Sequence, residues 1–208
     1  MNLDVYNING KKANKKIKLD DSIFGIEPNE HVVYLDIKRY LAKQRQGTSK
    51  AKERGEIKGS RVKLRRQKGL GHARVGDIKN PLFRGGGRVF GPKPRVYDIK
   101  INKKVKILAR KSALSGKAKE NKIKVVENFN FEEPKTKKLS EIFKNLNIEQ
   151  LKTLLVLSKN DENLFLSSRN IPNTRIMQAS DLNTYEILNA EQLLFMESSI
   201  LAIEKILN

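Results

Sequence analysis

Apolar residues recur with two different periods along the chain, and these periods predict a domain of mixed strands and helices. Residues 3–8 alternate apolar and polar side chains and end at Asn9-Gly10, which predicts a strand that leads into a hairpin turn. Helical spacing predicts two long helices, one from Pro28 through Gln46 and the other over residues 103–118.

Both long helices are predicted to be amphipathic. The apolar face of the first comprises Val32, Val33, Leu35, Ile37, Tyr40 and Leu41. The residues of the second that are expected to face the core are Val105, Leu108, Ala109, Ser112 and Ala113. Its outward face is then basic, with Lys104, Lys106, Arg110, Lys111 and Lys117.

Beyond the second long helix, short apolar runs and helical patterns take turns. Residues 153–157 form a continuous apolar run, which is typical of a strand buried on both faces of a parallel sheet. We further expect strands at 123–126, 175–178 and 193–196, and helices at 139–146, 163–168 and 198–207, the last of them capped by Ser198. This alternation predicts a single three-layer α/β domain with a mainly parallel sheet and helices on both faces.

Between the two long helices the periodicity disappears. Residues 43–95 hold ten of the 13 glycines and three of the six prolines, and their apolar residues are isolated. A stretch of this length without an apolar face cannot build a core of its own. We therefore expect residues 1–46 and 96–208 to form the globular domain, and residues 47–95 to form a long, basic, irregular loop inserted between the two helices.

The net charge of +20 is concentrated in this middle region. Residues 43–95 carry 17 basic and three acidic side chains, whereas residues 139–208 carry six basic and nine acidic ones. Such an excess does not help a chain to fold, and it indicates a polyanionic partner, with nucleic acid as the first candidate. A membrane is the weaker alternative, because no apolar stretch reaches 18 residues and the start has no secretory pattern.

Candidate catalytic and metal-binding groups are sparse in the sequence. The chain has no cysteine, which fits a reducing cytosol, and its two histidines, His31 and His72, are far apart, so we expect no metal site and no cofactor. The glycine clusters at 69–72 and 85–88 lack the Lys-Ser/Thr of a phosphate-binding loop and do not join a strand to a helix. The sequence therefore predicts a protein that is not an enzyme; a nuclease or nucleotide-dependent enzyme remains an alternative, as does a regulator of DNA or messenger.

The residue types of the loop suit folded RNA. Arginine forks onto phosphates and stacks on bases, and glycine lets the backbone approach phosphates closely. Phe83 and Phe90 offer rings for unpaired bases, whereas readers of duplex DNA usually place a helix or ribbon in a groove. The candidate RNA-binding residues are Arg45, Gln46, Thr48, Lys50, Arg54, Arg61, Lys63, Arg65, Arg66, Gln67, Lys68, Arg74, Lys79, Arg84, Arg88 and Arg95, with Lys104 and Lys111 of the second long helix.

Several motifs in the loop also carry a family resemblance. They are Arg45-Gln46-Gly47-Thr48, then Arg66-Gln67-Lys68-Gly69 with Gly71, Ala73 and Arg74, then Gly76 with Ile78-Lys79, Pro81, Phe83-Arg84 and Gly86-Gly87. Later stretches at 102–104, 133–137 and 161–170 fit the same pattern. In this order and spacing, over nearly the whole chain, they resemble the bacterial form of the universal large-subunit ribosomal protein number four.

The resemblance implies a structural role in the large ribosomal subunit, in the cytoplasm. Members of the family bind large-subunit (23S) rRNA directly, act early in assembly and contact other large-subunit proteins, and the loop tip helps to line the polypeptide exit tunnel near the nascent peptide. The chain is accordingly not expected to form a homo-oligomer or to bind a membrane. The residues that match the tunnel tip are Arg66, Gln67, Lys68, Gly69, Leu70, Gly71 and His72. Here the chain departs from many relatives, which carry an aromatic residue at the position of Arg65 and often Thr and Arg at those of Leu70 and His72.

Overall fold

The computed structural model describes residues 1–207, and they fall into two compact units. One unit combines Met1–Leu41 with the chain from Lys100 onward, and the other is Ala42–Ile99. The first contains the whole sheet and nearly all of the buried residues, and we call it the α/β unit. The second contains the predicted loop, and we call it the loop unit.

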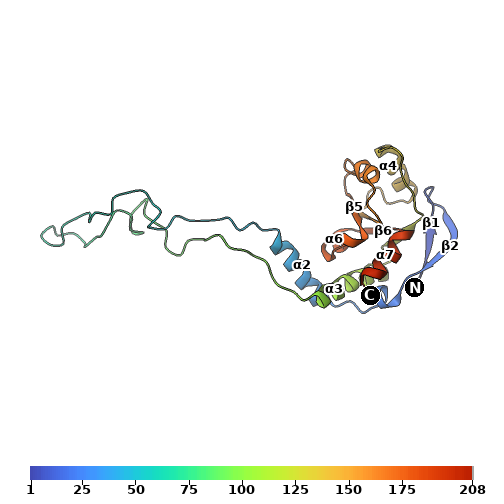
Figure 1. Cartoon of the computed structure of the whole chain (residues 1–208), viewed down its shortest axis with the longest axis horizontal. Coiled ribbons are helices and arrows are strands. Elements are labelled where there is room, and N and C mark those ends of the chain that lie inside the picture. The colour runs from blue at the N-terminus through green and yellow to red at the C-terminus, as the bar shows by residue number, and fades with distance from the viewer. Residues whose placement is uncertain (208) are drawn as a thin grey trace. The chain divides into compact units, whose positions relative to one another are not determined.

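The α/β unit is built on one six-stranded sheet with the strand order β2-β1-β3-β6-β4-β5 (Figure 1). The strands are β1 (Asn2–Tyr6), β2 (Lys12–Lys18), β3 (Ile123–Val126), β4 (Thr153–Leu157), β5 (Thr174–Gln178) and β6 (Gln192–Met196). Only β2 runs antiparallel to its neighbour, and the other pairs are parallel. The prediction of a mainly parallel α/β sheet is confirmed.

Helices cover both faces of this sheet. They are α1 (Asp21–Phe24), α2 (Glu30–Lys43), α3 (Lys103–Lys119), α4 (Thr136–Asn145), α5 (Glu162–Ser168), α6 (Thr184–Asn189) and α7 (Glu197–Leu207), with a 3₁₀ turn, η1, at Ala179–Asp181. One apolar cluster joins α1, α3, α6 and α7 to one face, and a second joins α4 and α5 to the other. The predicted three layers are therefore present.

The central strands explain the continuous apolar run in the sequence. All five residues of β4 are buried, and so are all five of β6. Because successive side chains of a strand point to opposite faces, Leu154 and Val156 enter one cluster while Leu155 and Leu157 enter the other. A strand covered on both faces favours apolar residues on both, and four of the five residues in each of these strands are apolar.

The first long helix differs from its prediction. It begins at Glu30, because the side chain of Asn29 accepts the backbone N–H of Val32, and it ends at Lys43 rather than at residue 46. Its predicted apolar face is not fully buried: Leu41 is 44% exposed, and the only buried residue of the helix is Asp36.

Polar and aromatic contacts hold α2 instead of an apolar stripe. Asp36 accepts hydrogen bonds from Thr184 Oγ1 at 2.7 Å and from Arg39 Nε at 3.1 Å. The ring of Tyr40 stacks on that of Tyr185, with 5.0 Å between centroids. Thr184 and Tyr185 both belong to α6, a short helix that the sequence pattern did not predict.

The second long helix buries more of its circumference than was predicted. Lys117, expected to face outward, is only 8% exposed and donates to the backbone carbonyl of Ala190 at 2.7 Å. Burial lowers the pKa of this ammonium group. Leu108, expected to face the core, is 38% exposed. The C-terminal half of α3 is enclosed because α1 and α6 both pack against the helix.

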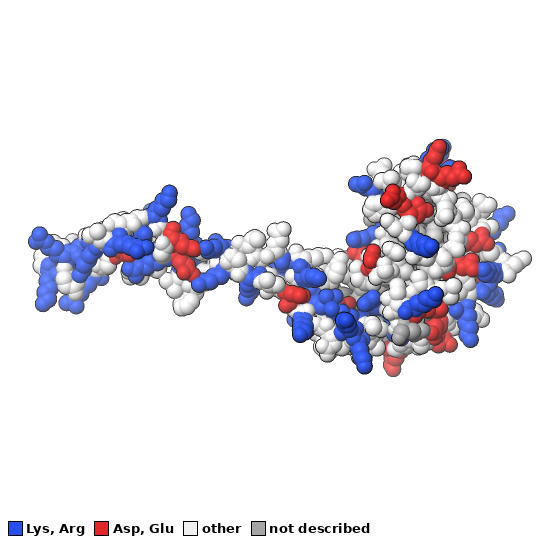
Figure 2. Space-filling view, in the orientation of Figure 1, with Lys and Arg blue, Asp and Glu red and all other residues white. Residues whose placement is uncertain are grey.

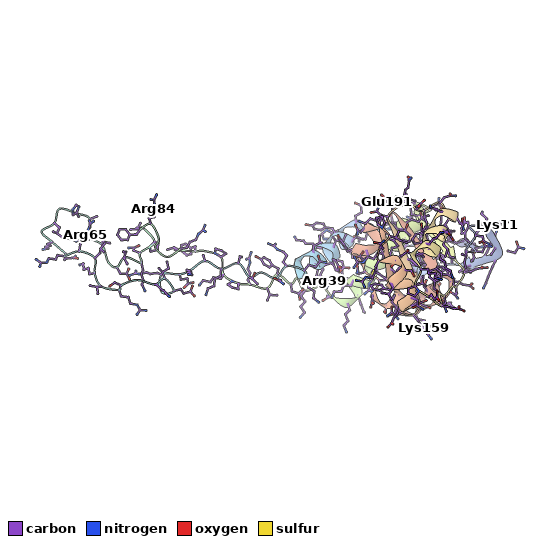
Figure 3. All side chains as sticks on the ribbon, turned by 90° about the horizontal axis from the view of Figure 1, so that it is seen from above. Lys11, Arg39, Arg65, Arg84, Lys159 and Glu191 are labelled. Atoms are coloured by element: carbon purple, nitrogen blue, oxygen red, sulfur yellow. The ribbon has the colours of Figure 1, made fainter. Side chains whose placement is uncertain are left out.

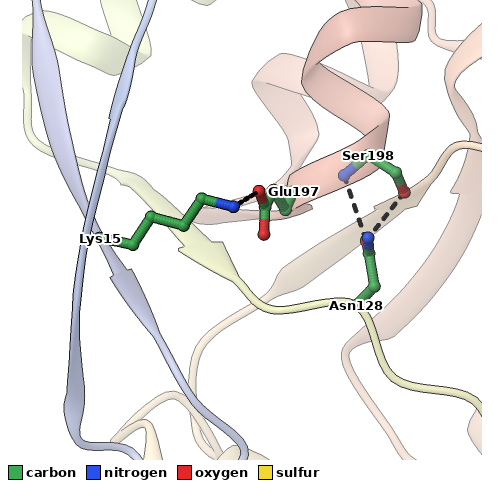
Figure 4. Close-up of polar contacts among 4 residues, drawn as sticks. All are labelled: Lys15, Asn128, Glu197 and Ser198. Carbon is green, nitrogen blue, oxygen red and sulfur yellow. Dashed lines mark hydrogen bonds and ion pairs between the residues drawn. The ribbon is translucent and has the colours of Figure 1, made fainter.

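The predicted cap of the last helix is also wrong. The helix begins at Glu197, so Ser198 lies inside its first turn. Asn128, from the loop after β3, supplies the capping oxygen: its Oδ1 accepts the backbone N–H of Ser198 at 3.1 Å and the hydroxyl at 2.8 Å (Figure 4). A residue 70 positions away in the chain therefore caps this helix, which a local pattern does not reveal.

Candidate nucleic-acid interface

The loop unit has no helix or strand beyond Lys43, yet its two arms run side by side. Backbone hydrogen bonds join Arg95 N to Gly47 O at 3.1 Å, Ala51 N to Pro92 O at 3.0 Å and Arg88 N to Lys52 O at 3.0 Å. The arms, residues 47–52 and 88–95, are therefore antiparallel, and these three bonds set which residues stand opposite each other, with a shift of register between Ala51 and Lys52. They hold the intervening chain as a hairpin-like loop.

Tyr97 organises the start of the arms, and sequence reasoning missed it. The guanidinium of Arg45 lies 4.0 Å from the ring centroid of Tyr97, and that of Arg95 lies 4.7 Å from it. A hydrogen bond with Arg95 lowers the pKa of the Tyr97 hydroxyl. Gly47 fits here because a Cβ atom at this position would lie 2.1 Å from the carbonyl oxygen of Arg95. Two of the predicted RNA-binding arginines are thus oriented by one ring.

All three acidic residues of the segment 43–95 form ion pairs inside the loop unit. Glu56 pairs with Lys50 at 2.5 Å, Glu53 with Lys93 at 2.5 Å and Asp77 with Arg54 at 3.0 Å. The hydrogen bond from Lys50 lowers the pKa of Glu56, and the one to Glu53 raises the pKa of Lys93. These are exposed contacts, except for the buried carboxylate of Asp77, so they act mainly by fixing the arms in place.

A glycine turn packs against this paired region. Gly87 approaches the backbone of Arg54 so closely that a Cβ atom would lie 2.4 Å from the Arg54 nitrogen. Its N–H donates to the carbonyl of Lys79 at 3.0 Å. Lys79, a predicted RNA-binding residue, is itself only 7% exposed. A phosphate contact by Lys79 stays a prediction, and it would require the side chain to move out of its buried position.

The tip of the loop, residues 60–74, has the opposite character. Every residue in it is exposed, it contains no acidic residue, and the bond from Leu64 N to Gly76 O at 2.9 Å closes it. Gly69 and Gly71 have φ angles of +89° and +64°, which other residues rarely adopt. Its six cations, which make no ion pair within the described residues 1–207, are Arg61, Lys63, Arg65, Arg66, Lys68 and Arg74.

The pictures show the same division of charge within the loop unit. Lys and Arg side chains dominate its surface, and the few acidic ones lie away from the tip (Figure 2). The side chains of Arg65 and Arg84 point away from the backbone trace (Figure 3). The other predicted RNA-binding residues of the loop unit that are exposed are Arg45, Gln46, Thr48, Lys50, Arg54, Gln67, Arg88 and Arg95.

The α/β unit contributes the two predicted residues of α3. Lys104 is exposed and Lys111 is partly exposed, and neither forms an ion pair within residues 1–207. Both therefore have a free ammonium group, in contrast to the buried Lys117 on the same helix.

A polar cleft of about 570 Å³ lies where β3, β4 and β6 end. Polar side chains that line this cleft form hydrogen bonds with one another: the hydroxyl of Ser198 bonds to Asn128 and, at 2.9 Å, to Ser158. Among the described residues, no group of three His, Cys, Asp or Glu side chains is placed to hold a metal ion. Within the same residues, no helix is long and apolar enough to cross a bilayer.

Comparison with known proteins identifies the family. The model of the ribosomal protein L4/L1 family matches residues 17–206. The protein named large ribosomal subunit protein uL4 from Phocaeicola vulgatus is 57% identical over 208 residues, and its counterpart from Bacteroides fragilis is 56% identical over 207, each covering 100% of both chains. That of Christiangramia forsetii is 55% identical over 204 residues, or 98% of both chains. The resemblance seen in the sequence is confirmed, and the chain belongs to the ribosomal protein L4/L1 family.

Proposed function

We propose that this chain, a structural constituent of the large ribosomal subunit, binds the rRNA of that subunit directly and helps its early assembly. The loop unit makes the main contact in this proposal, and the α/β unit acts as the scaffold that presents it. The chain works without catalysis, in the cytoplasm, beside rRNA and other proteins of the subunit.

The unpaired charge of the tip carries this proposal. Six cations within 14 residues have no acidic partner among residues 1–207, and all of them are exposed. Each cation that meets a phosphate releases counterions, so RNA binding stabilises this segment without any apolar core. Arginine, which supplies four of the six, also stacks on unpaired bases, and this favours folded RNA over a simple polyanion.

The tip itself is proposed to help line the polypeptide exit tunnel. Support comes from the family pattern and from the loop geometry, because Gly69 and Gly71, with left-handed φ angles, lie midway along the segment that the Leu64–Gly76 hydrogen bond closes. Residues 66–72 would then lie nearest to the nascent peptide. Arg65, Leu70 and His72 give this tip its own side-chain chemistry.

Charge reversal on α3 tests the second surface of the proposal. The salt dependence of rRNA binding is the slope of the logarithm of the binding constant against the logarithm of salt concentration. We expect the double variant Lys104→Glu, Lys111→Glu to reduce the magnitude of this slope by roughly 1.4 to 1.8, since each lost phosphate contact removes about 0.7 to 0.9. Filter binding at several salt concentrations measures the slope. Lys117 is left intact, because a charge reversal at its buried contact with Ala190 would unfold the helix packing.

The matched control for α3 carries the same change of charge on another helix. Lys137 and Lys138 of α4 are exposed and unpaired within residues 1–207, so Lys137→Glu, Lys138→Glu is the reference. Equal slopes for the two double variants would confine RNA recognition to the loop unit.

A further inference from the structure

A row of lysines lies along one edge of the sheet. These lysines come well before the loop unit in the sequence. Residues 11–18 contain five lysines, and seven of these eight residues form β2, the outermost strand on one side of the sheet (Figure 1). The net charge of residues 1–42 does not reveal these lysines, because this segment as a whole carries seven basic and six acidic residues. Folding separates the two signs, since the acidic residues other than Asp4 lie in and around α1 and α2.

The two faces of β2 are different. Ala13 and Ile17 pack against the core, and Lys15, which shares their face by the alternation of a strand, pairs with Glu197 at the start of α7 (Figure 4). Lys15 is therefore a structural contact. The opposite face presents Lys12, Lys16 and Lys18, and Lys11 stands at the turn that precedes the strand.

These four residues, Lys11, Lys12, Lys16 and Lys18, form what we call the β2 lysine patch. All four are exposed. Lys12 pairs with Asp4 at 2.7 Å, a contact that raises the pKa of the lysine. The other three make no ion pair within residues 1–207. The four lysines carry four positive charges and Asp4 carries one negative charge, so the patch together with Asp4 has a net charge of +3.

Lysines on an edge strand also have a simple protective use, because they discourage pairing with another sheet. The opposite edge shows how little charge this fold needs for that purpose. Strand β5 carries one basic residue, Arg175, and its guanidinium pairs with Glu186 at 2.6 Å. Protection alone therefore does not account for three free lysines on β2 and its turn.

We propose that the β2 lysine patch is a further contact with rRNA phosphates, made by the α/β unit independently of the loop unit and of the α3 lysines. It rests on the proposed function, and it adds a surface that the family motifs do not include. Lysines act as point charges and lack the planar fork that reads or stacks on bases. The contact would therefore be insensitive to sequence and strongly sensitive to salt.

Neutralising the free lysines tests this contact. The triple variant Lys11→Gln, Lys16→Gln, Lys18→Gln keeps both structural pairs, those of Lys12 and Lys15. We expect its salt-dependence slope for rRNA binding to fall by about 2 to 3 relative to the unmodified full chain, from three lost contacts at 0.7 to 0.9 each. The control Lys137→Gln, Lys138→Gln, Lys159→Gln removes the same charge from exposed sites on and near the α4 side of the sheet and should change the slope by less than a third of that.

Lysine acylation read by mass spectrometry provides a second measurement on the unmodified chain. Bound rRNA should protect Lys11, Lys16 and Lys18 and leave Lys137, Lys138 and Lys159 reactive. Equal slopes for the two triple variants, or full reactivity of the patch in the RNA complex, would overturn the proposal. Protection in whole subunits but not on rRNA alone would assign the patch to a protein and would also overturn it. Failure of the proposed function would look different, since the full chain would then not bind rRNA at all.

Discussion

Neutralising the loop tip is expected to weaken the salt dependence of rRNA binding, reducing the magnitude of the slope of log binding constant against log salt concentration by about 4 to 5. The variant replaces the six tip cations with glutamine, at positions 61, 63, 65, 66, 68 and 74. Each of them is exposed and free of ion pairs within residues 1–207, so each is available to a phosphate and contributes roughly 0.7 to 0.9 to the slope. Binding to 23S rRNA, measured between about 50 and 200 mM salt, gives the slope directly.

The control for the tip must change net charge by the same amount. Six exposed lysines of the α/β unit serve this purpose: Lys122, Lys137, Lys138, Lys144, Lys159 and Lys205. Their replacement by glutamine should lower the slope by no more than one. If this control matched the tip variant, affinity would follow net charge and the tip would have no special role. Duplex DNA as a competitor separates RNA recognition from simple polyanion binding.

Truncating Phe195 is expected to destabilise the protein by about 3 to 5 kcal/mol. This side chain lies in β6, the central strand between β3 and β4, and it is fully buried in the larger apolar cluster. Phe195→Ala removes the ring from a packed site that neighbouring strands cannot fill by collapse. Urea unfolding followed by circular dichroism measures the change in the free energy of unfolding.

Phe90 is the matched control, because the same atoms are deleted from an exposed site in the loop unit. Phe90→Ala should leave the free energy of unfolding within about 0.5 kcal/mol of the unmodified chain. If its ring stacks on an unpaired base, this variant loses RNA affinity instead. A stability loss for Phe90→Ala similar to that of Phe195→Ala would mean that the loop unit shares the core of the protein.

The fold could be predicted where burial leaves a periodic trace. The strand β4 was found because a strand covered on both faces is mostly apolar, and Asn9-Gly10 marked the hairpin turn. Short elements such as α1 and α6 were missed, since four to six residues give too few turns to define a period. The burial of Lys117 and the capping of α7 by Asn128 depend on partners distant in sequence.

The candidate interface could be predicted to the level of segments. Charge and glycine counts located the loop, because RNA contact needs many cations close together in the chain. The same counts could not show that Glu53 and Asp77 pair with Lys93 and Arg54, or that Tyr97 orients two arginines. Averaging over residues 1–42 also hid the lysines of β2, because most acidic residues of this segment lie in and around α1 and α2, which only the folded structure shows to be separate from β2.

The pairing of the two arms has a consequence for how this protein tolerates changes of length. Hydrogen bonds at Gly47–Arg95 and Ala51–Pro92 fix which residues stand opposite each other. Deletion of one residue from either arm would therefore misalign the hydrogen-bonded residues that follow the deletion. The chain between Leu64 and Gly76 has no such constraint, because only its ends are tied together. Insertions that natural variation or an engineer introduces should therefore be harmless to the architecture at the tip, and costly a few residues below it.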